Sequence, residues 1–244
     1  MDFALTPEQE QFAREFNEYL DKHLTPEVTA EAEIFLNMNK DTDPGEFRRG
    51  EYGGPKSKEF IRRMGADGWL GVGWPKEYGG QGRSVMEQHI FYEAIWARRA
   101  PFPVLTLNAV GPTIMKLGSE EQKREFLPRI LKGDLEIAIG YTEPDAGTDL
   151  ASLKTVGVKD GDSYVINGNK VFTSIAHLAD YLWIAVRTDP DPAKKHKGLS
   201  IFLIDVDTPG ITIDPIYTLG GHRVNSVYLK DVVVPQTCLV GEEN

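Results

Sequence analysis

The chain changes its residue pattern once, near Gly133-Asp134, and this change constrains the fold more than any other feature. Before this point apolar residues recur at helical spacing, whereas after it they form short runs rich in β-branched and aromatic residues. Helices first and strands second indicate segregated layers, because a doubly wound fold alternates strands with helices. We therefore expect an α+β chain with an N-terminal helical bundle at residues 1–134 and an antiparallel β-domain at residues 135–244.

The helical half carries repeated start signals. A Ser or Thr that caps the first turn is followed three residues later by Glu or Gln, which is the capping-box pattern. We predict such starts at Thr6 with Gln9, Ser84 with Glu87 and Ser119 with Gln122. Apolar residues at helical spacing follow each start, and the run from Phe60 to Met64 indicates a further helix. Residues 37–56 are polar and without period, which predicts a long loop.

The second half consists of β-prone runs separated by turn residues. The runs are Glu136 to Tyr141, Thr155 to Lys159, Tyr164 to Asn167, Tyr181 to Arg187, Leu199 to Val206 and Ser226 to Val234. The pairs Asp160-Gly161, Asn167-Gly168 and Pro209-Gly210 predict turns between them. Antiparallel strands in a domain of this size predict a two-sheet sandwich or an open barrel.

Charge and composition exclude several classes of function. The net charge of −10 disfavours a nucleic-acid or anionic-membrane partner, because an acidic surface repels polyanions. The single cysteine and the five scattered histidines predict no metal site. No apolar run reaches the roughly 20 residues of a membrane span, and the start lacks the pattern of a signal peptide. We expect a cytoplasmic protein.

The stretch from Ile139 to Asp149, with the sequence IGYTEPDAGTD, ends the first β-prone run and carries the most chemistry. Gly140 and Gly147 allow a ligand to approach the backbone closely, and Thr142 and Thr148 add hydroxyl groups. Such a loop can hold a flat heterocycle and a phosphate. An ordinary β-turn with side-chain caps explains the same residues equally well.

A second stretch, from Asn167 to Ser174, has the sequence NGNKVFTS and is predicted as a hairpin turn that leads into a strand. Phe172 can form a wall against a ring, and Thr173 or Ser174 can donate a hydrogen bond to it. The alternative interpretation places Phe172 in the core, which is the usual position of an aromatic residue in a strand.

Together the two stretches resemble the flavin-site sequences of the acyl-CoA dehydrogenase family, Thr-Glu-Pro-x-Ala-Gly-Ser-Asp and Gly-x-Lys-x-Trp-Ile-Thr. Supporting similarities lie at Gly71 to Gly80 (GVGWPKEYGG), Gly118 to Lys123 (GSEEQK), Lys197 to Ser200 (KGLS) and Asp231 to Pro235 (DVVVP). The detail of residues 141–154 is most similar to actinobacterial subunits that dehydrogenate CoA esters of sterol side chains.

The resemblance implies FAD as cofactor, an acyl-CoA thioester as substrate and an electron-transfer flavoprotein as acceptor. It implies flavin contacts at Ile139, Gly140, Tyr141, Thr142, Gly147, Thr148, Phe172, Thr173 and Ser174. Thr142 and Ser174 would approach N5 and the pyrimidine edge of the ring, and Thr148 would also face the CoA entry. Donors around the ring stabilise the charge that builds on a flavin as it accepts a hydride.

Three of these positions depart from the family pattern. Phe172 stands where the family has Trp, Thr173 where it has Ile, and Thr148 where it has Ser. Because Phe is smaller than Trp, we expect a roomier pocket that suits a bulky thioester, although a degenerate site explains the change too. The basic run Lys194 to Lys197 either contacts a CoA phosphate or forms a solvated loop, which is the more common role of such a run.

In this family the catalytic glutamate lies on a C-terminal four-helix domain, and Val240 to Asn244 resemble the sequence just before that domain. We therefore expect no catalytic base in this chain, and we interpret Glu143 as a turn residue or a partner of Lys or Arg. The first hypothesis is an acyl-CoA dehydrogenase that is inactive as this chain alone and oligomeric once the C-terminal domain is added. The alternatives are a non-catalytic subunit of a heteromeric enzyme and a related-fold flavin oxidase or monooxygenase.

Overall fold

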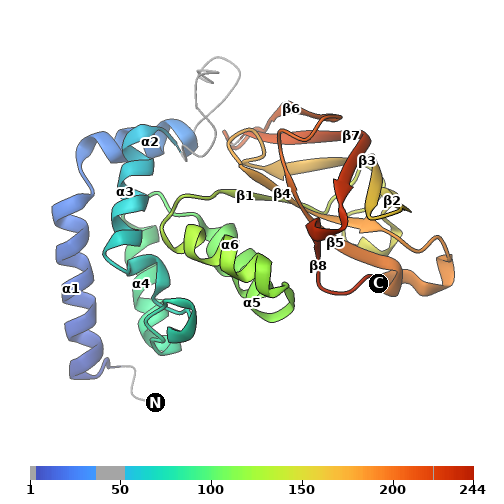
Figure 1. Cartoon of the computed structure of the whole chain (residues 1–244). Coiled ribbons are helices and arrows are strands. Elements are labelled where there is room, and N and C mark those ends of the chain that lie inside the picture. The colour runs from blue at the N-terminus through green and yellow to red at the C-terminus, as the bar shows by residue number, and fades with distance from the viewer. Residues whose placement is uncertain (1–3, 37–52, 222) are drawn as a thin grey trace.

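The computed structural model describes residues 4–36, 53–221 and 223–244, and it contains a helical region followed by a region of β-strands (Figure 1). The α-helices are α1 (Pro7–His23), α2 (Pro26–Leu36), α3 (Pro55–Ala66), α4 (Val85–Ala97), α5 (Gly111–Leu117) and α6 (Glu120–Leu131). A π-helical segment, η3 (Thr106–Val110), leads directly into α5. This order confirms the α+β class expected from the sequence.

The predicted capping boxes are confirmed at all three helix starts. At the start of α1, the backbone N–H of Gln9 donates to the Thr6 hydroxyl at 3.3 Å, and the backbone N–H of Thr6 donates to the Gln9 side chain at 2.9 Å. The reciprocal bonds satisfy two amides that a helix otherwise leaves without partners at its start. The capping pattern therefore located these helix starts from sequence alone.

Aromatic packing forms the core of the helical region. The Phe16 ring of α1 lies 4.5 Å from the Phe91 ring of α4 and 4.7 Å from the Trp69 ring. Trp74 is 6% exposed, and its indole N–H donates to the Leu107 carbonyl of η3 at 3.0 Å. These contacts join α1, α4 and η3 into one apolar cluster.

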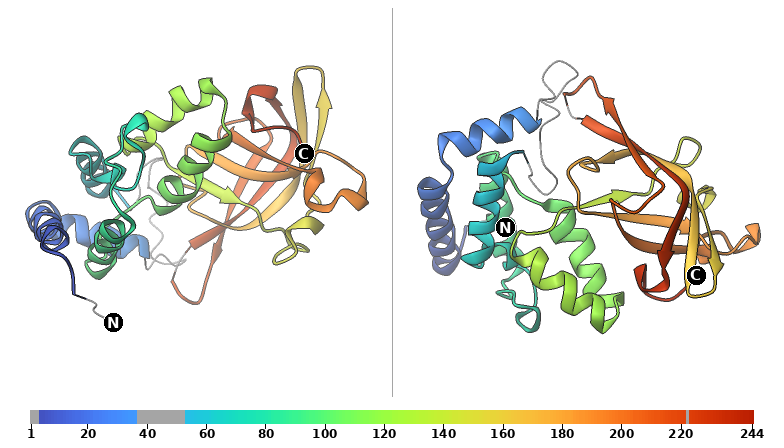
Figure 2. Two further views of the ribbon diagram at one scale, coloured as in Figure 1. Left: turned by 90° about the horizontal axis from the view of Figure 1, so that it is seen from below. Right: turned by 45° about the horizontal axis from the view of Figure 1, so that its top comes forward.

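The strands form one sheet that curves around its own apolar cluster (Figure 2). They are β1 (Ile137–Gly140), β2 (Val156–Asp160), β3 (Ser163–Ser174), β4 (Tyr181–Arg187), β5 (Leu199–Asp205), β6 (Ile211–Tyr217), β7 (Arg223–Pro235) and β8 (Leu239–Val240). The hydrogen-bonded order is β6-β7-β3-β2-β4-β5-β8, and β1 pairs with β4 outside this path. The curved sheet agrees with the predicted barrel-like β-domain.

Strand β4 is buried on both faces. Trp183 belongs to the apolar cluster of the helical region, whereas Leu182 and Ile184 belong to the cluster inside the sheet. A strand covered on both sides has a continuous apolar sequence, which is the pattern of residues 181–187. Because β1 pairs with β4, it too lies between the helices and the interior of the sheet.

The structure corrects four details of the prediction. Strand β1 pairs with β4 in parallel, not antiparallel. Strand β6 was missed although residues 211–214 alternate, because its sequence, ITIDPIY, contains a proline, which is tolerated on this edge strand. Asn167-Gly168 is no turn, because β3 continues through it with a shift in register. Helix α3 begins at Pro55, so the predicted loop ends before residue 56, and residues 37–52 lie outside the described residues.

Glycine at position 168 has a packing reason. A Cβ atom there would lie 2.3 Å from the Thr155 hydroxyl oxygen, so β2 and β3 come close only because residue 168 has no side chain. The side chain of Asn167 accepts a hydrogen bond from the backbone N–H of Asp231 at 2.8 Å, which ties the irregular point of β3 to β7. The asparagine and glycine therefore mark a β-bulge rather than a chain reversal.

No helix of the described residues is long and apolar enough to cross a membrane.

A buried carboxyl group lies where the helices meet the sheet. Glu136 is 3% exposed, its Oε1 accepts a hydrogen bond from the Thr106 hydroxyl at 2.9 Å, and its backbone N–H donates to Asp180 at 2.8 Å. Lys58 of α3 is also buried, and its charge favours the ionised form of Glu136. Burial outweighs these interactions and raises the pKa of Glu136 to about 7.

We expect the substitution Glu136→Gln to stabilise the chain above pH 7 and to have little effect at pH 4.5. In the wild type the unfolded chain ionises near its ordinary pKa of 4.5, whereas the folded chain holds the proton until about pH 7. The free energy of unfolding therefore falls as pH rises between these values, by about 3 kcal/mol in total. Glutamine remains neutral, so the variant lacks this loss. Thermal unfolding of both proteins across this range measures the difference.

The exposed carboxylate Glu93 of α4 provides the control, because Glu93→Gln removes a charge without changing a buried group. Because Glu93 is exposed, Glu93→Gln should lack the pH-dependent gain in stability expected of Glu136→Gln. A constant difference between Glu136→Gln and the wild type across the same pH range would contradict the raised pKa.

Candidate functional site

The two motif segments predicted from sequence meet in the structure. Strand β1 continues into the loop that contains Thr142, and the backbone N–H of Val171 in β3 donates to the Thr142 carbonyl at 2.9 Å. This bond places Phe172, the next residue of β3, beside the start of the loop. Beyond this point the loop closes on itself through paired backbone bonds between Glu143 and Ala146 at 2.8 and 3.2 Å.

A buried ion pair connects the same segments. Lys170 Nζ lies 2.7 Å from Glu143 Oε1, and the two side chains are 0% and 5% exposed. Burial alone would raise the pKa of Glu143, but hydrogen bonds from Lys170, Thr155 and Lys154 outweigh burial and lower it below the ordinary value. Glu143 is therefore a partner of a lysine, as one of the sequence interpretations held, and it is an ionised, weakly basic group.

The two glycines of the loop have different surroundings. A Cβ atom on Gly140 would lie 3.0 Å from Ile184 Cγ2 and 3.4 Å from Lys170 Cγ, so residue 140 is small because protein atoms pack against it. A Cβ atom on Gly147 would meet nothing within 4 Å. Only Gly147 leaves open space beside the backbone, which is what close approach of a ligand requires.

Ile139 and Tyr141 pack on the helices instead of facing outward. Both side chains lie against the apolar cluster of the helical region. The Tyr141 hydroxyl accepts a hydrogen bond from the Trp183 indole N–H at 2.7 Å, and burial raises the pKa of Tyr141. Both residues are half-buried, so their side chains are partly covered by the helices.

Phe172 projects from the sheet. The register between β3 and β7 shifts between Lys170 and Thr173, and within this bulge Phe172 has a φ of 56°. Its side chain is 61% exposed, which excludes the alternative that it belongs to the core. A non-glycine residue with positive φ is conformationally unfavourable, and such strain is concentrated at functional sites.

The four predicted hydroxyl groups differ in access. Thr142 and Ser174 are partly exposed and Thr148 is exposed, and within the described part of the chain none of their hydroxyls makes a hydrogen bond. Thr173 is only 1% exposed, and its hydroxyl has no hydrogen-bond partner among the described residues. Its carbonyl instead accepts a bond from the Asn225 side chain at 2.9 Å. Thr173 therefore presents no side-chain surface to a ligand in this structure.

The sequence analysis offered Lys or Arg as a partner of Glu143, but it did not identify Lys170 as that partner. A lysine between the apolar residues of a strand was a usable signal, because lysine is almost never fully buried without a partner.

The basic residues 194–197 lie in the exposed segment η5 (Pro192–Gly198), where Lys194 pairs with Asp189, and this agrees with a solvated loop.

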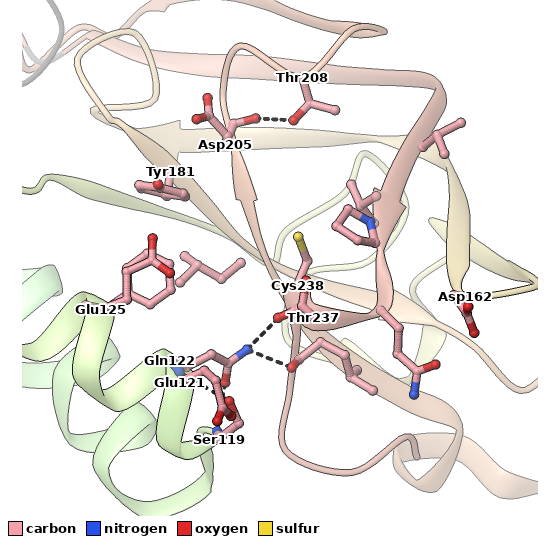
Figure 3. Close-up of a pocket in the computed structure, with 17 residues that line it drawn as sticks. Ser119, Glu121, Gln122, Glu125, Asp162, Tyr181, Asp205, Thr208, Thr237 and Cys238 are labelled. Atoms are coloured by element: carbon pink, nitrogen blue, oxygen red, sulfur yellow. Dashed lines mark hydrogen bonds between the residues drawn. The ribbon is translucent and has the colours of Figure 1, made fainter.

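A groove of about 860 Å³ lies elsewhere, between α6 and the sheet (Figure 3). The Gln122 side chain donates to the carbonyls of Thr237 and Leu239, both at 2.9 Å, and so joins α6 to the segment between β7 and β8 and to the start of β8. The groove includes the half-buried Cys238 and the carboxylates Glu121, Glu125, Asp162 and Asp205, and no lysine or arginine is among the described residues that line it. An acidic groove disfavours phosphate-bearing ligands, and it contains none of the predicted flavin contacts.

The domain family described as "Acyl-CoA dehydrogenase, N-terminal domain" matches residues 6–134, and "Acyl-CoA dehydrogenase, middle domain" matches residues 138–232. The chain belongs to the acyl-CoA dehydrogenase family. This confirms the resemblance on which the sequence interpretation rested. Members of this family are FAD-dependent flavoproteins.

Mycobacterial proteins are among the similar sequences. The acyl-CoA dehydrogenases FadE26 and FadE29 of Mycobacterium tuberculosis (strain ATCC 25618 / H37Rv) are 48% and 49% identical to the chain over 100% of its length. The chain covers 58% and 59% of those two proteins, so it spans less than two thirds of the relatives that it matches.

Solved structures of related proteins have the same fold. The ChsE4-ChsE5 complex from Mycobacterium tuberculosis matches with a TM-score of 0.86 and 46% identity over 100% of this chain and 58% of that chain. The protein described as the Tcur3481-Tcur3483 steroid ACAD matches with a TM-score of 0.86 and 45% identity over 99% of this chain and 59% of that chain.

The described residues fit a flavin at the junction of the two motif segments. Phe172 offers an exposed aromatic face, Thr142 and Ser174 offer hydroxyls that bond to no other described residue, and the backbone at Gly147 is open. An aromatic face with a few well-placed donors is what a flat heterocycle requires.

The two glycines predict different effects of added methyl groups. Gly140→Ala should lower the free energy of unfolding by about 1–3 kcal/mol, because its Cβ would press on the buried Ile184 side chain. Gly147→Ala should change stability by less than about 0.5 kcal/mol, since its Cβ would be in open space. Denaturant unfolding of both variants measures the difference. Equal losses would show that the packing around Gly140 is looser than described.

Proposed function

We propose that this chain contributes the flavin contacts and part of the substrate contacts of an enzyme that removes the α- and β-hydrogens of an acyl-CoA thioester. The observation that carries the proposal is the junction of the two motifs, where Val171 bonds to Thr142 and Phe172 is held outward with positive φ. Membership of the acyl-CoA dehydrogenase family supports the same reaction.

Each proposed contact has a chemical role at the site. FAD, when bound, supplies the hydride acceptor for the β-hydrogen of the substrate. The Phe172 ring packs against one face of the flavin, and the hydroxyls of Thr142 and Ser174 donate hydrogen bonds to polar atoms at its edge. Ile139, Gly140, Tyr141 and Gly147 contribute through the backbone, while Thr148 lies at the CoA entry. Thr173 supports the bulge from behind, because its side chain is buried.

The carboxylates near the site do not act as the base in this proposal. Glu143 accepts hydrogen bonds from Lys170, Lys154 and Thr155, so its lone pairs are in use and its pKa is lowered. Glu136 is buried and accepts from Thr106. We propose that the group that removes the α-proton comes from another polypeptide segment, and we expect residues 1–244 alone to be inactive.

A heteromeric enzyme is the favoured form of the assembly. The similar solved structures are described as the ChsE4-ChsE5 complex and as the Tcur3481-Tcur3483 steroid ACAD, and each description names two proteins. We infer that this chain, too, works with a related subunit, and that its substrate carries a steroid ring system. The acceptor of its electrons is a flavoprotein of the electron-transfer type.

The double substitution Thr142→Val with Ser174→Ala should weaken FAD binding by about tenfold or more, because two donors to the ring are lost at about 0.5–1.5 kcal/mol each. Lys195→Ala with Lys197→Ala, in the exposed segment η5, should change the affinity less than about twofold. Flavin absorbance of the desalted proteins reports how much FAD each retains. Equal retention in the two double variants would remove the basis of the site assignment.

We expect the completed enzyme to prefer polycyclic acyl-CoA thioesters to straight-chain ones, because Phe172 occupies less space than the Trp of the family pattern. Phe172→Trp should reduce this preference severalfold by filling the extra space. Reduction of an artificial electron acceptor, measured for the chain produced together with its partner, gives kcat/KM for each substrate. Residues 1–244 alone are the baseline without turnover. A preference for short linear chains would defeat the steroid proposal and leave the dehydrogenase proposal intact.

A further inference from the structure

The buried ion pair occupies a place that stability alone does not explain. Among the ion pairs between described residues, only Glu143 and Lys170 have both side chains less than a tenth exposed. Two charges in a protein interior lose their hydration, so a buried ion pair is weak evidence for stabilisation. Replacement of such a pair by apolar residues of similar volume often leaves stability unchanged or raises it. Its position between the motif segments suggests a role in their geometry.

The carboxylate of Glu143 joins three segments of the chain, through the Lys170 side chain and two adjacent backbone amides. Oε1 accepts from Lys170 Nζ at 2.7 Å and from the backbone N–H of Thr155 at 2.9 Å, while Oε2 accepts from the backbone N–H of Lys154 at 2.5 Å. One carboxylate therefore connects the loop after β1, the two residues just before β2 and the middle of β3. Displacement of any one segment would break a charge-assisted hydrogen bond inside the protein.

The lysine reaches this carboxylate across Gly140. A Cβ atom on Gly140 would lie 3.4 Å from Lys170 Cγ and 3.6 Å from its Cβ, so the stem of the lysine packs directly against the backbone at the end of β1. Its ammonium group then meets Glu143, three residues further along the loop. The stem and the ammonium group together fix where the loop lies on β3.

We propose that Glu143 and Lys170 are positioning residues that set the register between the loop after β1 and the bulge of β3, so that Thr142 and Phe172 meet the flavin together. This inference rests on the proposed function. Apart from the ion pair and the packing of the lysine stem on Gly140, the described residues join Thr142 to the bulge by one backbone hydrogen bond, from Val171 to Thr142. A single bond near exposed residues opens readily, whereas a buried charge cannot leave its partner without a large cost.

The loop also carries a matched control. Asp145 and Lys154 form an ion pair of 2.8 Å on the same loop, but their side chains are 69% and 73% exposed. Asp145→Asn removes one carboxylate charge, as Glu143→Gln does, from a pair that solvent already screens. If Glu143→Gln has an effect that Asp145→Asn does not have, that effect is therefore due to the buried pair.

The experiment compares Glu143→Gln, Glu143→Gln with Lys170→Met, and Asp145→Asn in the chain of residues 1–244. Three quantities are measured for each: the Tm without flavin, the rate of amide hydrogen exchange at Val171, and the Kd for FAD. The amide of Val171 reports register, because it bonds to Thr142 and not to the ion pair. The double variant leaves no unpaired buried charge, so it should recover most of the Tm lost in Glu143→Gln.

We expect Glu143→Gln to weaken FAD binding and to accelerate exchange at Val171 by at least about tenfold each. Both effects should persist in the double variant despite its recovered Tm, and Asp145→Asn should stay within about twofold of the wild type. FAD affinity that follows Tm in every variant would assign the pair to stability alone and overturn the inference. Unchanged exchange at Val171 in Glu143→Gln would overturn it as well.

A wild-type chain that binds no FAD even when produced together with its partner would contradict the proposed function on these residues. The exchange rates at Val171 would still decide whether the pair holds the register, because they require no ligand. The two failures are therefore distinguishable.

Discussion

The position of β4 between two apolar clusters is the constraint on which the rest of the structure depends. Trp183 packs with the helices, while Leu182 and Ile184 pack inside the sheet, so both regions bury apolar surface on the same strand. Loss of water from both faces is the main favourable contribution to this junction. Strand β1 pairs with β4 and ends at Gly140, and this places the chemically important loop at the edge of a layer that is covered on both faces.

From that edge outward, the geometry depends on polar contacts. The loop after β1 is shaped by the turn between Glu143 and Ala146 and by the ion pair with Lys170. A fully bonded buried charge gives a loop one well-defined arrangement, because every alternative leaves a donor or acceptor without a partner. The apolar junction supplies stability and the ion pair supplies precision, which is the combination that a site for a flat ligand needs.

Local signals made the helical region largely predictable. A capping box depends on residues three positions apart, so its evidence is complete within the sequence, and the starts at Thr6, Ser84 and Ser119 follow it. Strands β4 and β5 were equally clear, because burial gives them long apolar runs. Strand β6 was missed and Asn167-Gly168 was misread, because an edge strand and a bulge are decided by contacts with β7 and β2 that are distant in sequence.

The sequence by itself determined the α+β organisation, the acidic charge and the two motifs that indicate the acyl-CoA dehydrogenase family. These features depend only on residue types and their order along the chain. Only the tertiary structure decided which motif residues are accessible. It turned Phe172 outward, buried Thr173 and paired Glu143 with Lys170. The physical reason is that exposure and pairing depend on which strands become neighbours, and that choice is made by packing between residues far apart along the chain.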